Sequence, residues 1–251
     1  MKKILYIYFL IVLLGSCSHS PEWKLVWEEN FDGQTLDTTV WSRIYRGTPD
    51  WQNTQSFDDR CYDMHDGRLI LKGIVNDDLE KDPSPYLTGG VWTKGKHAFQ
   101  GGRIEVKAKL QGAQGAWPAI WMLPFDTVKY HWPQGGEIDI MEEVGCVPNE
   151  VSSSIHCKAY YHAINTQKTA KKTLEGAQTE FHTYALEWDE TEIKTYVDGV
   201  LLFRYKPEDH GKRNEQTWPF DKEFELKLNL AWGGDWGGMY GVDESCLPAT
   251  Y

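Results

Sequence analysis

Polar and apolar residues alternate with a period of two along much of this chain, a period typical of β-strands. Residues 103–110 and 223–230 alternate strictly, as expected of strands that bury one face. Two further runs, 192–197 and 200–205, are separated by an Asp-Gly pair. That pair favours a two-residue hairpin turn because it tolerates positive φ. The pattern therefore predicts antiparallel strands.

Other short runs are also expected to be strands, and they lie at residues 24–27, 68–74, 119–122, 137–144, 151–156 and 182–188. No stretch keeps a helical period over three turns, and no linker-like break divides the chain after Trp23. Many short strands with turns between them predict an all-β sandwich of two antiparallel sheets. Residues 23–251 are expected to form one domain, with variable loops at 76–88 and 158–178.

The first 22 residues are not expected to belong to that domain. Two lysines precede the apolar run 4–14, which is too short to span a bilayer and is typical of a signal peptide. Cys17 directly follows a pair of small residues, as in bacterial lipoprotein signals. We therefore expect residues 1–16 to be cleaved, and residues 17–22 to tether an exported protein to the bacterial cell envelope through a lipid on Cys17. The alternative is an ordinary signal peptide with an incidental cysteine.

Composition narrows the possible partners. The formal net charge is -11, which argues against nucleic acid, because nucleic-acid binding depends on lysine and arginine contacts to phosphates. Aromatic residues make up 14% of the chain, so some rings are expected to be free to bind a flat ligand. The protein is expected to be a monomer.

Four further cysteines, at positions 61, 146, 157 and 246, lack the close pairs of a zinc site. They are expected to be mostly free or structural thiols. A Cys146–Cys157 bridge across one hairpin is the alternative.

The most informative segment reads Gly-Gly-Glu-Ile-Asp-Ile-Met-Glu and ends at Glu142. In a strand, Glu137 and Asp139 share a face, whereas Glu142 would point to the opposite one. A β-bulge of one extra residue near Ile140 or Met141 returns Glu142 to the shared face. The Cα atoms of Glu137 and Glu142 would then be roughly 13 Å apart. Leaning side chains could bring the two carboxyl groups to the separation of about 5–5.5 Å that a retaining glycosidase needs.

Three carboxyl groups on one strand face cannot all ionise at neutral pH, so the pKa of one rises and that group becomes an acid. Asp139 is placed to hydrogen-bond Glu137 and to help hold a proton on the Glu142 side. The alternatives are a solvated acidic face and a calcium site. Repulsion between like charges disfavours three acidic side chains on one strand face that have no function.

This segment resembles the signature of glycoside hydrolase family 16 in its bulged, laminarinase-like form. Further matching segments lie at residues 102–110, 115–124, 181–188, 196–199, 218–221 and 228–238, so the resemblance extends from about Trp23 to the end of the chain. It implies a β-jelly-roll, concanavalin A-like sandwich with a substrate cleft across a concave sheet. It also implies a retaining endo-β-glycosidase in which Glu137 is the nucleophile, Glu142 the general acid/base and Asp139 an assisting residue. No cofactor and no catalytic metal are required, because two carboxyl groups supply the chemistry.

The resemblance also suggests residues that bind the substrate: Trp117, Trp121, Trp132, His156, Gln55 and Trp232. Trp117 and Trp121 are expected to stack on sugar rings, and His156 to lie near the acid/base. Gln55 is expected to reach a sugar hydroxyl. The alternative is core packing for Trp117 and Trp121, coverage of the sheet edge for Trp132, and a structural role for His156.

Two departures from the family pattern affect these expectations. Gly90 stands where laminarinases often carry an arginine that helps bind the substrate, which weakens the assignment to β-1,3-glucan. The sequence ends at Tyr251, before the strand that usually closes the fold, so either the given sequence is truncated or that strand is missing. That strand also carries an aspartate that helps hold a structural calcium in some relatives, so calcium has little support here.

The leading hypothesis is an endo-β-1,3- or β-1,3/1,4-glucanase acting on polysaccharide. An endo-β-galactosidase that cuts host O-glycans or algal galactans is the alternative within the same fold. A non-catalytic, lectin-like glycan-binding protein is the alternative of another class, because fold alone does not determine function. The complete set of three acids argues against the last.

Overall fold

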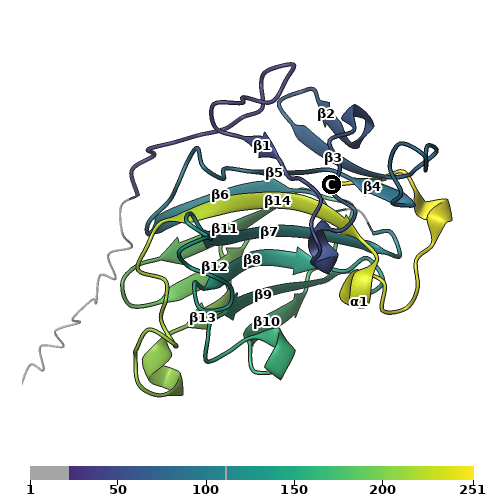
Figure 1. Ribbon diagram of the computed structural model, residues 1–251. Helices are drawn as coiled ribbons and strands as arrows, with labels where there is room; N and C mark the ends of the chain where they lie inside the picture. The colour runs from purple at the N-terminus through teal and green to yellow at the C-terminus, as the bar shows by residue number, and fades with distance from the viewer. Residues whose placement is uncertain (1–22, 111) are drawn as a thin grey trace, which may run out of the picture.

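Strands dominate the computed structural model, which describes residues 23–110 and 112–251 (Figure 1). The expected signal peptide, the lipid site at Cys17 and the tether lie outside the described residues. Within the described residues, no helix is long and apolar enough to cross a membrane.

The largest sheet has seven strands in the order β1-β5-β14-β7-β8-β9-β10, and all neighbours are antiparallel. The strands are β1 (Ser42–Arg43), β5 (Gly90–Trp92), β14 (Phe224–Trp232), β7 (Ala116–Pro124), β8 (Glu137–Glu143), β9 (Glu150–His156) and β10 (Lys168–Thr173).

A second sheet has the order β13-β12-β11-β6, with β13 (Val200–Tyr205), β12 (Ile193–Val197), β11 (His182–Trp188) and β6 (Gly102–Ala108). A third, smaller sheet has the order β15-β3-β2, with β15 (Ala249–Thr250), β3 (Leu69–Val75) and β2 (Tyr62–Met64), and β4 (Tyr86–Thr88) also pairs with β3. The helical turns are α1 (Gly234–Gly237), η1 (Asp50–Gln52), η2 (Asp59–Cys61), η3 (His162–Ile164), η4 (Pro207–His210) and η5 (Glu244–Cys246).

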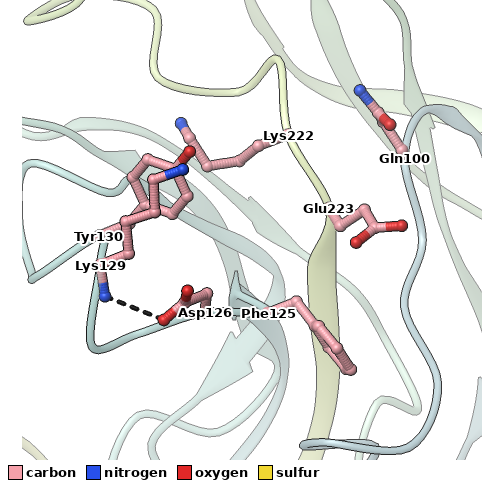
Figure 2. A pocket seen from close by; sticks show the side chains of 7 residues that line it. All are labelled: Gln100, Phe125, Asp126, Lys129, Tyr130, Lys222 and Glu223. Carbon is pink, nitrogen blue, oxygen red and sulfur yellow. Dashed lines mark hydrogen bonds between the residues drawn. The ribbon is translucent and has the colours of Figure 1, made fainter.

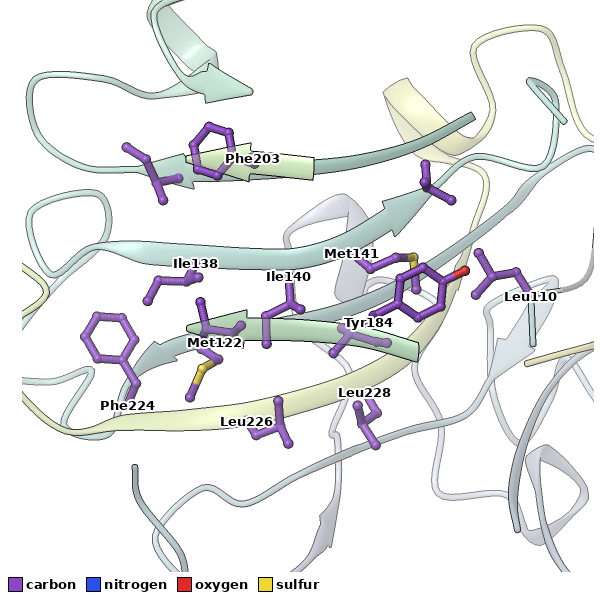
Figure 3. Packing of buried hydrophobic residues seen from close by; sticks show 14 of the residues in the cluster. Leu110, Met122, Ile138, Ile140, Met141, Tyr184, Phe203, Phe224, Leu226 and Leu228 are labelled. Atoms are coloured by element: carbon purple, nitrogen blue, oxygen red, sulfur yellow. The ribbon is translucent and has the colours of Figure 1, made fainter. Parts of the chain in front are cut away.

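The hydrophobic core lies between the seven-stranded sheet and the sheet that contains β11. Ile138, Ile140 and Met141 of β8 pack there with Leu226 of β14 and Tyr184 of β11 (Figure 3). Full burial of one such aliphatic side chain stabilises a fold by about 1.5–3 kcal/mol. The apolar positions of the alternating runs therefore join the two layers into the expected sandwich.

Most of the strand predictions are confirmed, including the hairpin whose turn residues Asp198 and Gly199 have φ of 49° and 75°. The prediction of a strand at residues 24–27 is wrong. That segment has no strand partner, and Leu25 and Val26 are exposed. β4 and β10 lie within the segments 76–88 and 158–178, which were expected to be variable loops.

The polar side of β14 differs from expectation. The alternation predicted a strand with one buried face, yet all nine residues of β14 are buried. Glu225, Lys227 and Asn229 point away from the core and are nevertheless covered. Loops therefore cover the second face of this strand, which a period-two pattern cannot reveal.

A short strand near the end of the given sequence joins the smallest sheet. Residues 249–250 form β15, where Ala249 pairs with Gly73 and Thr250 with Lys72 of β3. The four cysteines among the described residues are free thiols, so the Cys146–Cys157 bridge is not formed.

Candidate active site

The predicted β-bulge is present in β8. Asp139 pairs with Ser154 of β9, and the next pair is Glu142 with Ser152, so Ile140 and Met141 together oppose a single residue. Both Ile140 and Met141 are buried in the core (Figure 3). Burial of two consecutive apolar side chains shifts the alternation by one position and returns Glu142 to the side of Glu137.

The glycine pair before β8 allows this strand to begin where it does. A Cβ on Gly135 would lie 2.4 Å from the carbonyl oxygen of Tyr130, and Gly136 has φ of 91°. Glycine has no Cβ, so it accepts both a close approach of another backbone atom and a positive φ at low energetic cost. The pair therefore fixes the entry of the chain at Glu137.

We call the side of the seven-stranded sheet that carries Glu137, Asp139 and Glu142 the acidic face. The neighbouring strand β9 contributes His156, which pairs directly with Glu137. Its Nε2 lies 3.2 Å from Asp139 Oδ2 and 3.6 Å from Glu137 Oε1. Its direct contacts are therefore with Glu137 and Asp139, and its charge also acts on Glu142, whose pKa it lowers.

Burial raises the pKa of all three carboxyl groups. For Glu137 the burial effect comes first and the negative charge of Asp139 second, and together they raise the pKa to about 8. The same two causes raise the pKa of Glu142 to about 8. Burial also raises the pKa of Asp139, which hydrogen-bonds with Glu137. Groups this close share protons and titrate as a unit, so the site can hold both a carboxylic acid and a carboxylate near neutral pH.

Aromatic residues surround the acids. The indole Nε1 of Trp117 donates to Glu142 Oε1 at 3.1 Å, and Trp236 of α1 packs edge-on against Trp117 at 5.3 Å. Trp132 lies close enough to Glu137 to lower the pKa of that carboxyl group, and it is 39% exposed beside His162 of η3. Trp117 and Trp132 therefore lie beside the acids, and both are partly exposed.

Residues that pair directly across neighbouring strands form a row on the acidic face that passes through Asp139. We call it the register row. It runs from Trp92 through Lys227, Trp121 and Asp139 to Ser154. Trp121 and Trp92 are each only 5% exposed. The prediction that Trp121 stacks directly on sugars is therefore corrected, since its ring is covered.

The rings that cover this row come from an early loop. Trp51 of η1 packs edge-on against Trp121 at 4.6 Å, and Tyr45 packs edge-on against Trp92 at 5.0 Å. Trp51 is partly exposed and Tyr45 is half-exposed. Neither ring was predictable from the sequence, because nothing local marks a loop ring that folds onto a strand about 50–70 positions later.

Gln55 is not available to a substrate, contrary to expectation. It is 0% exposed, and its Nε2 donates to Thr88 Oγ1 and to the Leu230 carbonyl oxygen. A Cβ on Gly90 would lie 2.3 Å from Gln55 Oε1. Gln55 therefore fills the space beside Gly90, the position at which an arginine was expected in relatives.

Trp232 is likewise a core residue and not a binding residue. It lies on the core side of β14, is buried, and packs against Tyr86. The indole that reaches the acidic face from this region is Trp236, four positions later.

A cation site is the chemical alternative for part of this cluster. Glu137, Asp139 and His156 each offer one ligand atom, and these atoms lie within 4.8 Å of one another. Such residues can hold a divalent cation.

Two cavities lie away from the acids. One of 370 Å³ lies between the loop that precedes β8 and the start of β14, and Lys129, Tyr130, Lys222 and Glu223 are among its lining residues (Figure 2). The other, of 830 Å³, lies between residues 55–60 and 76–82. Neither contains a residue of the acid group.

Comparison with known proteins places the chain among carbohydrate-active proteins. Residues 63–245 match the family model described as glycosyl hydrolases family 16. A β-glucanase from Rhodothermus marinus is 36% identical over 258 residues, which cover 96% of this chain and 89% of the relative. A keratan-sulfate endo-1,4-β-galactosidase from Sphingobacterium multivorum is 35% identical over 233 residues, which cover 91% of this chain and 53% of the relative.

The X-ray structure of the laminarinase from Rhodothermus marinus has the same fold. It matches with a TM-score of 0.85 and 36% identity, and the match covers 92% of this chain and 94% of that chain. The expected β-jelly-roll sandwich is thereby confirmed.

Proposed function

Because this chain belongs to the glycosyl hydrolases of family 16, we propose that it is a retaining endo-β-glycosidase whose substrate is a β-1,3- or β-1,3/1,4-linked glucan. The observation that carries the proposal is the bulge in β8, which turns Glu137, Asp139 and Glu142 to one face among accessible aromatic rings. That arrangement is suited to covalent catalysis on a sugar chain.

In the first step, the Glu137 carboxylate attacks the anomeric carbon and the glycosidic C–O bond breaks. Glu142 gives its proton to the departing oxygen, so the leaving chain departs as an alcohol. Glu142 can supply this proton because burial raises the pKa values of the coupled acids, so the group shares a proton near neutral pH while another member stays ionised.

In the second step, Glu142, now a carboxylate, takes a proton from water. The water oxygen attacks the anomeric carbon and the bond to Glu137 breaks, which restores both glutamates. One water is consumed, and two displacements retain the β configuration. Asp139 and His156 hold Glu137 through their hydrogen bond and close contact.

A second substrate class, β-linked galactans, has specific support. The relative from Sphingobacterium multivorum is a keratan-sulfate endo-1,4-β-galactosidase. Gly90 and the buried Gln55 together leave no room for the arginine associated with laminarinases. Both substrate classes use the same acids, so product analysis must distinguish them.

The test is a panel of laminarin, barley β-glucan, keratan sulfate and mucin glycans, with sizing of the products and NMR of the first anomer released. We expect oligosaccharides of several lengths from one glucan, released as the β-anomer, with and without EDTA. Cleavage of keratan sulfate or mucin glycans alone would instead support β-linked galactans as the substrate class. Inversion of configuration, or loss of activity in EDTA, would contradict the mechanism.

The pH dependence follows from the raised pKa of Glu142. An ordinary glutamic acid has a pKa of 4.5, whereas that of Glu142 is about 8. The reaction needs protonated Glu142, so kcat/KM should fall as pH rises through the raised value, and the basic limb should lie above neutral pH. Because the charge of Asp139 contributes to the rise, Asp139→Asn should move the basic limb to lower pH. A wild-type basic limb near pH 5 would contradict the assignment.

We also propose that the protein is exported and lipid-anchored to the cell envelope, on the evidence of the apolar run 4–14 and of Cys17. Labelled palmitate should enter the wild-type protein in a bacterial host, and Cys17→Ser should abolish the label. Equal labelling of both proteins would contradict the anchor.

A further inference from the structure

A buried ion pair lies under the aromatic part of the acidic face. Lys227 and Glu225 of β14 are 1% and 0% exposed and form an ion pair with each other. The second carboxylate oxygen of Glu225, Oε2, has no hydrogen-bond partner. Both side chains point away from the core, on the same side of β14 as Asn229.

Stability does not account for this pair. Removing two charges from water costs more than their attraction commonly returns, and well-packed apolar replacements are often neutral or stabilising. The neighbouring position on this face, Leu123 of β7, is apolar and pairs with Glu225. An apolar pair would therefore suit the site, and the charge calls for another explanation.

The contacts of the ammonium group supply that explanation. Lys227 Nζ lies 4.7 Å from the ring centre of Trp92 and 5.3 Å from that of Trp121. A cation at this range is attracted to the face of an indole, and the attraction is stronger where water is excluded. Trp121 is also held by a 2.7 Å hydrogen bond from its Nε1 to Asn229 Oδ1. Lys227 therefore links two neighbouring rings of the register row.

Each of these two rings supports one of the more exposed rings above. Tyr45 packs on Trp92 with an angle of 74° between the planes, and Trp51 packs on Trp121 with an angle of 82°. The edge-to-face geometry fixes the tilt of the upper ring relative to the lower one. Tyr45 is 48% exposed, so its ring is available to a sugar. We call Tyr45 and Trp51 the aromatic wall.

We propose that Lys227 is a positioning residue, which orients the aromatic wall through Trp92 and Trp121 so that the wall binds sugar units distant from the bond that is cut. Lys227 lies two strands from Asp139 in the register row, about 10 Å at the usual strand spacing. Trp51 lies over Trp121, which pairs directly with Asp139, whereas Tyr45 lies over Trp92, two strands further away. Only an extended chain therefore reaches both rings of the wall. The inference rests on the proposed function and adds to it a determinant of chain-length preference.

The test uses a double variant that removes the charges without leaving one unpaired. Glu225→Met with Lys227→Met keeps the volume of both side chains and should leave the melting temperature within a few degrees of wild type. We expect KM for a long glucan to rise about tenfold while kcat changes less than about twofold. KM for a short aryl β-glycoside, which spans only the acid group, should not rise. Lys107→Met, on β6 of the other sheet, is the matched control and should change neither constant.

A second variant tests whether Lys227 acts through the wall. Tyr45→Ala alters an exposed ring and should raise KM for the long glucan on its own, without loss of stability. Added to the double variant, it should raise KM by less than about twofold more, because the wall is already misplaced. Full additivity, an unchanged KM in either variant, or an equal rise for the short substrate would overturn the inference. Failure of the proposed function would instead be evident as a wild-type protein that cuts no polysaccharide.

Discussion

Glu137→Gln is expected to lower kcat on polysaccharide by about 10⁴-fold or more, the scale of loss seen when a covalent nucleophile is removed. The amide keeps the size of the side chain and its place opposite His156, but it cannot form the glycosyl ester. KM should change little, because the rings that contact the sugar are untouched. The measurement is reducing-sugar release from the best substrate of the panel.

The matched control for this variant is Glu143→Gln. Glu143 follows Glu142 on the same strand, is buried on the opposite side of the sheet and accepts a hydrogen bond from Gln178. Burial raises its pKa to about 7, so an uncharged amide is a fair substitute near neutral pH. Activity within about threefold of wild type is expected, since the residue does not touch the reacting atoms. A comparable loss in both variants would mean that the Glu137 result reflects damage to β8.

Glu142→Gln is expected to lower kcat on polysaccharide by about 10³-fold, within the range that general acid–base catalysis supplies. The loss should depend on the leaving group. An aryl glycoside with a good leaving group needs no proton, so its first step should remain fast and the glycosyl-enzyme should accumulate on Glu137. Mass spectrometry of the intact protein, followed by peptide mapping, would locate the added sugar.

Rescue by azide separates this role from a structural one. Azide needs no general base, so it should attack the trapped intermediate in Glu142→Gln and release a β-glycosyl azide. The same addition should not rescue Glu137→Gln, which forms no intermediate. If azide fails to accelerate Glu142→Gln, or yields the α-product, Glu142 is not the acid/base of a retaining enzyme.

The arrangement of the three acids was predictable because it depends only on which positions of one strand point to the same face. Glu137 and Asp139 are two positions apart, and the apolar Ile140 and Met141 both require burial. One bulge is the simplest way to bury both and keep the strand paired. The strands and the Asp-Gly hairpin were predictable for the same reason, since period and turn type are properties of neighbouring residues.

Which rings face a ligand was decided by tertiary structure. Trp121 and Trp232 have the same local appearance as Trp117 and Trp236, yet the first two are buried and the last two partly exposed. The difference arises because the loop at residues 45–52 folds over β5 and β7, and because the even positions of β14 face the core. Burial depends on which distant segment covers a side chain, and that segment cannot be predicted from the periodicity of a single strand.

The sequence by itself determined the strand pattern, the bulge and the three acids on one face, because each follows from the alternation of side chains along one strand. Only the tertiary structure decided that Gln55 fills the space beside Gly90, that His156 contacts Glu137 and Asp139, and that Lys227 lies beneath Trp92 and Trp121. These contacts join strands far apart in the chain, and their geometry is set by sheet register and loop packing.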